Sequence, residues 1–439
     1  MLDPTPHIER FGSYERACLE FRCLIPDTFN IADAILSRHS DAVTRIALLE
    51  MRPGGLNTYT YGGLDYLSDK FATALRQQGV VAGESVAVVL PQSAASMIAQ
   101  LGALKLGAVV VPLSPALEAP ALEFAIRDCG ARAVIIHHTL RDKLASAVSS
   151  TAVVFVQNTL KPEFEDTGRD FDFWREVFEA SADFAFVGTP ANSPAFAFYR
   201  ADSEGRLVCA THNHASLIHQ LPAFSMCSDF QLGKDTTFWT PQDWTSIDSS
   251  LCSVYPALWY GWRVLARESP MTRSSAWSLI ERCEVSNLFA SPSELDLLRQ
   301  STPPALSPAA LRLRSIVCGG AVAVDVHEWA SELLGVTAGA VYCDPVVGSV
   351  ASSCGPWFEA RPPSRGRATP GYSVSIVDER GRELPPHSEG QVAIRRTDPH
   401  APVEQSVRQP KLASDSGPGW ITHGCAGFKD EDGYLWLEG

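Results

Sequence analysis

The stretch Val86–Leu113, VAVVLPQSAASMIAQLGALKLGAVVVPL, decides the class of the fold. It opens with Val86–Leu90, a short run rich in β-branched residues that predicts a strand. Pro91 and Ser93 then begin a helix, and Gly107 ends it. The apolar residues between them recur at helical spacing: Met97, Ile98, Leu101 and Leu104. Val109–Leu113 is the next strand, so the stretch predicts one strand–helix–strand unit.

The pattern continues on the C-terminal side of this unit. Ala121–Asp128 is helical, and Arg132–Ile136 is a further strand. Later, a helix over Ala276–Cys283 precedes apolar strands at Asn287–Ala290 and Leu313–Val317. Helices that alternate with buried strands predict a parallel sheet with helices on both faces.

Past about residue 367 the pattern changes. Tyr372–Asp378 and Gln391–Arg395 each alternate apolar and polar residues around a turn-like segment, which predicts a β-hairpin. The polar, proline-containing segment 397–419 predicts a loop. We therefore expect an α/β core over 1–366, divided into subdomains of roughly 30–190 and 191–366, and a smaller β-rich subdomain over 367–439.

Composition limits the classes of partner. The 439 residues include 36 Lys and Arg against 50 Asp and Glu, a formal charge of −14. An acidic chain repels nucleic-acid phosphates and anionic lipid surfaces, so neither nucleic acid nor a membrane is expected as a partner. Val86–Leu113 is interrupted by polar residues and is no membrane span, and MLDPTPHIER lacks the features of a signal peptide. We expect a cytoplasmic protein.

General catalytic and metal motifs are absent from the sequence. It contains no GxGxxG fingerprint, no GxxxxGK[ST] loop and no GxSxG elbow. The eleven cysteines form no CxxC pair, so we expect free thiols. His212 and His214 have no acidic or cysteine neighbour in sequence, which favours a structural role over metal binding. No metal ligand and no catalytic residue is assigned.

Six segments, in order, carry a resemblance. They are Tyr59–Leu64 (YTYGGL), Leu106–Leu113 (LGAVVVPL), Phe238–Trp244 (FWTPQDW), Val317–Ala321 (VCGGA), Gly419–Ile421 (GWI) and Asp430–Leu435 (DEDGYL). Together they resemble motifs of the AMP-forming acyl-CoA synthetases, an adenylate-forming family, and within it the acetyl- and medium-chain branch. The resemblance implies the N-terminal part of that fold: two helix-covered α/β subdomains and a smaller β-rich subdomain. The chain stops where the family's C-terminal domain would begin, so we expect that domain to be absent.

Members of this family join a carboxylic acid to ATP with Mg²⁺ and pass the acyl group to coenzyme A. Their triphosphate loop, TSGTTGxPKG, corresponds here to Tyr199–Val208. Asp202 and Glu204 introduce carboxylates there, and Val208 replaces a lysine. Of the phosphate-contacting positions, the resemblance leaves Ser203, Gly205 and Arg206.

Two further nucleotide motifs are altered. Tyr342 matches the aromatic residue that stacks on adenine, but Val346 stands where the family has a glutamate for Mg²⁺, which prefers oxygen ligands. Cys425 stands where an aspartate holds the ribose hydroxyls, and a thiol is a poor acceptor. Gly319 and Gly320 match the family's glycine turn.

The acyl pocket of the family matches Trp244, Ser246, Ile247 and Asp248. Asp248 and the following Ser249 replace glycines. A carboxylate in that position disfavours a simple fatty acyl tail. The alternative is that these residues repack an empty cleft.

Three functions stay open at this point. The first is a synthetase-like protein with impaired ATP binding, a pseudoenzyme that binds an acid or acyl ligand, a protein partner or an active homologue. The second is a carboxylic acid–CoA ligase whose C-terminal domain is supplied separately. The third is an ATP-independent enzyme that uses the acyl cleft. ATP or AMP, Mg²⁺ and coenzyme A are implied by the resemblance alone.

Overall fold

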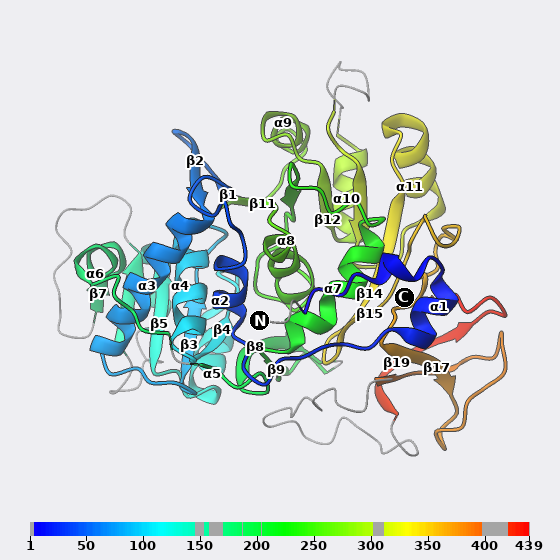
Figure 1. Ribbon diagram of the computed structural model, residues 1–439, viewed down its shortest axis with the longest axis horizontal. Coiled ribbons are helices and arrows are strands. Elements are labelled where there is room, and N and C mark those ends of the chain that lie inside the picture. Colours follow the sequence, from blue (N-terminus) through cyan, green and yellow to red (C-terminus); the bar gives the residue numbers. More distant parts are fainter. Residues whose placement is uncertain are drawn as a thin grey trace.

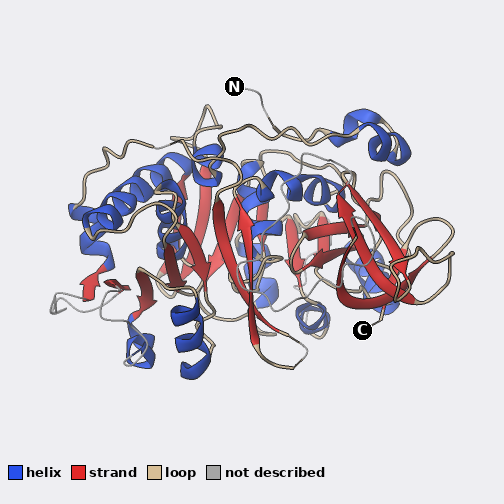
Figure 2. Ribbon diagram, turned by 90° about the horizontal axis from the view of Figure 1, so that it is seen from below, coloured by secondary structure: helices blue, strands red, loops and turns tan. Residues whose placement is uncertain are grey.

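The computed structural model describes residues 4–144, 153–157, 170–186, 188–202, 204–301, 311–396 and 420–438. Its strands form a seven-stranded sheet, a nine-stranded sheet and a four-stranded sheet within these residues. In Figure 1 the chain passes from its dark-blue N-terminal part, beside the small sheet at the right, to the blue and cyan helices around the first sheet, and returns through green and yellow to the small sheet at the lower right. Helices lie on both sides of the strands in Figure 2, as the alternating sequence pattern predicts.

The strands are grouped by sheet as follows. The first sheet contains β3 (Ser85–Val89), β4 (Val109–Pro112), β5 (Ala133–His137), β6 (Val153–Gln157), β7 (Asp170–Asp172), β8 (Pro194–Ala201) and β9 (Leu207–Asn213). The second contains β1 (Ile46–Arg52), β2 (Gly55–Thr60), β10 (Thr237–Trp239), β11 (Arg263–Arg267), β12 (Asn287–Ala290), β13 (Ser315–Cys318), β14 (Ala338–Asp344), β15 (Gly348–Ser352) and β16 (Arg367–Ala368). The third contains β17 (Tyr372–Val377), β18 (Gly390–Arg396), β19 (Ile421–Lys429) and β20 (Leu435–Leu437).

The helices cover these sheets. The α-helices are α1 (Tyr14–Glu20), α2 (Ile31–Leu36), α3 (Tyr61–Gln77), α4 (Ala94–Lys105), α5 (Ala119–Asp128), α6 (Phe173–Glu179), α7 (Ser216–Cys227), α8 (Tyr255–Trp259), α9 (Ala276–Arg282), α10 (Pro292–Arg299) and α11 (Val324–Trp329). Short 3₁₀ segments lie at η1 (Ile8–Phe11) and η2 (His138–Leu144), and π-helical turns at η3 (Ser250–Val254) and η5 (Ala330–Leu334).

The unit predicted from Val86–Leu113 is present as β3, α4 and β4, which confirms the α/β class. Strands β3 and β4 pair in parallel, with Val86 opposite Val110. Ser93 caps α4 by accepting the N–H of Ser96 at 3.2 Å. Every residue of α4 is buried, which explains why its sequence is apolar on all sides.

Each of the two large sheets contains strands from the part of the chain that mostly builds the other sheet. Strands β1 and β2 precede the first sheet in the chain but lie at the edge of the second, where β1 pairs in parallel with β11. Strands β8 and β9 form an antiparallel hairpin at the edge of the first sheet. The division of the core near residue 190 stays a proposal, because strands on each side of it complete the other side's sheet.

The hairpin predicted beyond residue 367 is formed by β17 and β18, which pair antiparallel with Tyr372 opposite Arg396. The predicted loop 397–419 lies outside the described residues. Helix α1, from the other end of the chain, lies beside this small sheet (Figure 1). There the Tyr14 hydroxyl donates to the Ala368 carbonyl at 2.8 Å, and its ring meets that of Phe358 edge-on at 5.2 Å.

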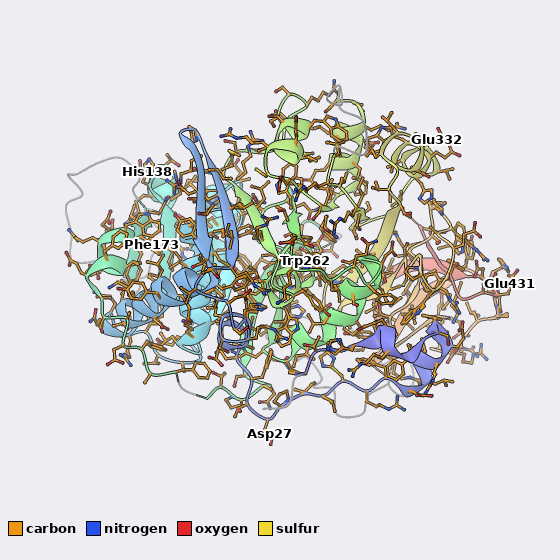
Figure 3. All side chains as sticks on the ribbon, turned by 45° about the horizontal axis from the view of Figure 1, so that its top comes forward. Asp27, His138, Phe173, Trp262, Glu332 and Glu431 are labelled. Atoms are coloured by element: carbon orange, nitrogen blue, oxygen red, sulfur yellow. The ribbon has the colours of Figure 1, made fainter. Side chains whose placement is uncertain are left out.

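The largest core lies between the first two sheets and their helices. Trp262, which is fully buried, lies near its centre (Figure 3). The eleven cysteines are free thiols. Among the described residues, no helix has both the length and the apolar character needed to cross a bilayer.

Candidate functional site

The segment expected to meet a triphosphate is the tip of the β8–β9 hairpin. Strand pairing continues to Ala201 opposite Leu207, and the Asp202 N–H donates to the Arg206 carbonyl at 2.8 Å, which leaves a three-residue loop between Asp202 and Arg206. Asp202 Oδ1 accepts the backbone N–H groups of Glu204 and Arg206, each at 2.9 Å. Ser203, which was expected to serve phosphate, lies outside the described residues.

Arg206 is paired within the same turn. Its guanidinium lies 2.9 Å from Asp202 Oδ2 through Nη2 and 2.9 Å from Glu204 Oε2 through Nη1. The N–H of Arg206 and its side chain lower the pKa of Asp202, and the Asp202 carboxylate raises the pKa of Arg206. Gly205 takes a φ of +77°, a conformation that favours glycine. In this conformation, Gly205 supplies the turn and Arg206 neutralises the turn's own carboxylates.

The same turn occurs twice more among the residues that the structure describes. In each, the carboxylate of the first residue accepts the N–H groups of the third and fifth, and the fourth is a glycine with positive φ. The additional copies are Asp378–Arg382, between β17 and the strand bridge at Glu383, and Asp430–Tyr434, between β19 and β20. A three-residue loop with an αL glycine is a common closure of β-hairpins. The tip of β8–β9 therefore has the construction of an ordinary hairpin turn.

Gly319 and Gly320 follow β13, and a side chain on either would meet a close neighbour. A Cβ on Gly319 would lie 3.1 Å from Phe289 Cζ, and one on Gly320 would lie 2.7 Å from Pro292 Cγ. The same positions lie 3.6 Å from Asp248 Oδ2 and 3.3 Å from Arg365 Nη1. The structure thus brings the expected acyl-pocket residue Asp248 to the glycine turn, and adds a cation there.

Tyr342 and Cys425 interact with each other and with Arg365. Burial raises the pKa of both the Tyr342 hydroxyl and the Cys425 thiol. Burial lowers the pKa of Arg365, whose charge acts on both of them. Three of the expected nucleotide residues, Gly320, Tyr342 and Cys425, therefore lie near Arg365, and Gly319 precedes Gly320 in the chain.

The position expected to hold Mg²⁺ offers no carboxylate ligand. Val346 has no side-chain oxygen, and Asp344, the nearest acid in sequence, is 1% exposed. Asp344 Oδ1 accepts the N–H groups of Val346 and Val347, each at 2.9 Å, and so holds the turn between β14 and β15. The described residues contain no cluster of three His, Cys, Asp or Glu side chains suited to a metal. These residues do not fit Mg²⁺ in the way that the family's glutamate would.

The expected acyl-pocket residues divide into two groups. Trp244 and Ile247 are 3% and 7% exposed and belong to the main core. Ser246 and Ser249 share a hydrogen bond of 2.7 Å between their hydroxyls, so the polar side chains of this segment bind one another. Asp248 alone reaches the glycine turn.

A small cavity of about 10 Å³, room for roughly one water molecule, lies beside Cys252 of η3. Phe289 and Val317 line it on one side and Cys252 of η3 on the other. The Cys252 thiol lies 3.4 Å from the thiol of Cys343, which is next to Tyr342 in sequence. This contact, followed by burial, raises the pKa of Cys343. The cavity leaves no space for a long apolar tail.

Sequence reasoning missed Arg365, Cys252, Cys343 and Glu294. Glu294 forms a capping box with Ser291 at the start of α10. Burial raises the pKa of Glu294, and the nearby Asp248 carboxylate raises it further. None of these positions carries a local signal, because each acquires its neighbours only through the pairing of distant strands.

His214 has a structural contact. Its Nδ1 accepts the N–H of Ile31 at 3.1 Å, and burial lowers its pKa to about 3, so the ring is neutral near pH 7. His212 is fully buried, and its ring lies 5.6 Å from that of Phe198. His214 therefore connects β9 to the start of α2.

Comparison with solved structures shows the fold. An acyl-CoA synthetase from Brucella canis superposes with a TM-score of 0.85 at 23% identity, over 97% of this chain and 79% of that one. The inhibitor-bound N-terminal domain of FACL13 from Mycobacterium tuberculosis gives 0.78 at 22% identity, over 94% and 99%.

Sequence comparison with curated proteins finds acetyl-coenzyme A synthetases among the similar sequences. An acetyl-coenzyme A synthetase from Bacillus subtilis is 22% identical over 93% of this chain, which spans 72% of that relative. One from Pyrobaculum aerophilum is 25% identical over 87% of this chain, which spans 61% of its length. The family model described as "AMP-binding enzyme" matches residues 37–398. With most of its length matched by that model, this chain belongs to the family of AMP-binding enzymes.

Proposed function

We propose that this chain is an acyl-CoA synthetase-like protein that binds a carboxylic acid and whose binding of ATP is impaired. It would then act as a binding or partner protein. The observation that carries the proposal is the hairpin tip, where Asp202 occupies the N–H groups of Glu204 and Arg206. A phosphate oxygen needs such donors, and here they are already satisfied by a carboxylate of the same sign.

The cation of the turn is engaged in the same way. Arg206 pairs with Asp202 and Glu204, so a triphosphate would have to displace two carboxylates to reach it. Those carboxylates would then stand unpaired beside the incoming charge. Two further nucleotide contacts are missing, because Val346 has no side-chain oxygen and Cys425 replaces the ribose aspartate. Their loss supports the proposal.

The second candidate is an AMP-forming carboxylic acid–CoA ligase that works with a separately supplied C-terminal domain. The family membership and the acetyl-coenzyme A synthetases among the relatives favour it. So does the retention of Tyr342 beside Gly319 and Gly320, which keeps an aromatic side chain near the glycine turn. The two candidates differ in whether the chain binds ATP.

Titration calorimetry with Mg-ATP and with AMP separates them, followed by pyrophosphate exchange with a panel of carboxylic acids. We expect no saturable heat at millimolar nucleotide and no exchange. Micromolar binding of Mg-ATP together with exchange would establish the ligase and overturn the impaired-binding proposal.

A gain-of-function variant gives a second test. It combines Ala201→Ser, Asp202→Gly, Glu204→Thr, Val208→Lys, Val346→Glu and Cys425→Asp, and we expect it to bind Mg-ATP. Asp378→Gly, in an equivalent turn of the small sheet, is the control and should leave nucleotide binding unchanged. Equal nucleotide binding by the wild type and the combined variant would contradict the role given to these positions.

A further inference from the structure

We propose that Cys252 and Cys343 form an oxidation site, at which a hydroperoxide converts the two thiols to a reversible disulfide. Their sulfur atoms lie 3.4 Å apart. The two residues are 91 positions apart in sequence, one in the π-helical turn η3 and the other near the end of strand β14. Neither thiol has a part in the proposed binding of an acid, so the two proposals stand separately.

Cys252 is held in place by a buried amide. Its side chain is 5% exposed, and its thiol donates to Gln220 Oε1 at 3.3 Å. Gln220 is fixed in turn, because its Oε1 accepts the N–H of Ser349 at 2.7 Å and its Nε2 donates to the Val347 carbonyl at 3.2 Å. With the thiol proton directed to Gln220, the Cys252 sulfur contacts Cys343 through its lone pairs.

Cys343 is the thiol that an oxidant reaches first, because it is partly exposed whereas Cys252 is buried. Successive side chains of a strand point to opposite faces, so Tyr342 packs against the core of the small sheet and Cys343 against the main core, which also contains Cys252. The contact with Cys252, followed by burial, raises the pKa of Cys343, so this thiol is protonated near pH 7 and reacts slowly. The pair therefore stays reduced until an oxidant is supplied in excess.

The reaction balances with the hydroperoxide as its co-reactant. The Cys343 sulfur attacks a peroxide oxygen, the O–O bond breaks, and Cys343 becomes a sulfenic acid while an alcohol or water leaves with the thiol proton. The Cys252 sulfur then displaces the sulfenic hydroxyl, which leaves as water with the second thiol proton, and the S–S bond forms. The two sulfurs together lose two electrons, and the peroxide gains them. The sulfurs approach by about 1.4 Å to reach the bonding distance of about 2.0 Å.

The test is treatment of the reduced full chain with millimolar hydrogen peroxide, followed by blocking of free thiols with N-ethylmaleimide and digestion with trypsin and endoproteinase Asp-N. This digestion places Cys318, Cys343 and Cys354 on different peptides, because an aspartate separates each from the next. We expect mass spectrometry to find the Cys252–Cys343 peptide pair at least tenfold above any other cysteine pair, and to lose it after dithiothreitol. Absence of this pair, or equal amounts of it and of other pairs, would overturn the proposal.

Two variants assign the order of the steps. Cys252→Ser removes the thiol that resolves the sulfenic acid, so dimedone, which labels sulfenic acids, should label Cys343 at least fivefold more than in the wild type. Cys283→Ser is the matched control, since Cys283 is 4% exposed in the core of the second sheet, and it should keep the Cys252–Cys343 pair. Unchanged labelling of Cys343 in a folded Cys252→Ser variant would also contradict the proposal. Digestion of the oxidised wild type needs no variant, so misfolding of a variant does not remove the test.

Discussion

Asp202 acts at the tip of the β8–β9 hairpin as a bound anion acts in a phosphate loop: it accepts two backbone N–H groups and pairs with an arginine. Its carboxylate is covalently part of the loop, so the anion is present at an effective concentration that a free nucleotide does not reach. The replacement of a single glycine by aspartate thus explains more than the addition of one negative charge.

This arrangement predicts the exchange of specific amide protons. In Asp202→Ala, the N–H groups of Glu204 and Arg206 lose their acceptor, and we expect them to exchange with solvent several-fold faster. Asp202→Asn keeps an acceptor oxygen and should leave exchange closer to that of the wild type. The measurement is hydrogen exchange read by mass spectrometry.

Asp378→Ala is the control for this experiment, because it should accelerate exchange at Arg380 and Arg382 and not at the β8–β9 tip. Unaltered exchange of Glu204 and Arg206 in Asp202→Ala would contradict the hydrogen bonding described for this turn.

How much of the site is predictable from sequence differs from residue to residue. Asp202, Val346 and Cys425 were identifiable because each departs from a motif at a fixed place in a local segment. Arg365 was not, because an arginine in RPPSRGRATP has no local feature that distinguishes a cleft residue from a surface one. The availability of Arg206 also could not be read from sequence, since it depends on how the turn folds back on itself.

At the scale of elements, Glu50 of β1 joins the second sheet to helix α4 of the first. Its carboxylate is 3% exposed, takes two hydrogen bonds from Arg52 at 2.8 and 3.1 Å, and accepts the N–H of Ala94 at 2.9 Å. A carboxylate at this end of a helix is also favoured by the helix dipole.

Glu50→Gln should therefore lower the free energy of unfolding by about 2 kcal/mol, because it replaces the anionic partner of Arg52 with a neutral amide and removes the charge at the helix end. Urea unfolding followed by tryptophan fluorescence measures the change. Glu20→Gln removes an exposed pair with Arg16 and should cost much less. A Glu50→Gln variant as stable as Glu20→Gln would contradict the role assigned to Glu50.

The elements that sequence predicts well are those set by their own periodicity. β3, α4 and β4 follow from the alternation of apolar runs, and the β17–β18 hairpin follows from period-two patterning. The placement of β1 beside β11 did not follow, because their pairing joins residues about two hundred positions apart. Local patterns give the type of an element, and long-range pairing gives its place.

For the whole molecule, burial of His214 links stability to pH. Its pKa falls to about 3 in the folded chain, against about 6.5 when unfolded. Between these values the unfolded chain binds a proton that the folded chain does not. The free energy of unfolding should therefore fall as pH drops from about 6.5 toward 3, by up to about 1.4 kcal/mol per pH unit from this group.

Melting temperatures of the wild type and of His214→Asn between pH 4.5 and 7 measure this contribution. The asparagine oxygen can still accept the N–H of Ile31, but it cannot be protonated in this range. The variant should therefore show a shallower loss of stability toward acid, since the carboxylates contribute equally to both proteins. Parallel pH profiles would refute the assignment.

The exchange of edge strands between the two large sheets has a consequence for how the chain can be divided. A cut between residues 190 and 191 would leave β1 and β2 on one fragment and β8 and β9 on the other, each pair belonging to the sheet that the opposite fragment mostly builds. Neither half is then a self-sufficient unit. Each carries the missing edge of the other, which is the arrangement from which two separately made halves reconstitute a whole by complementation.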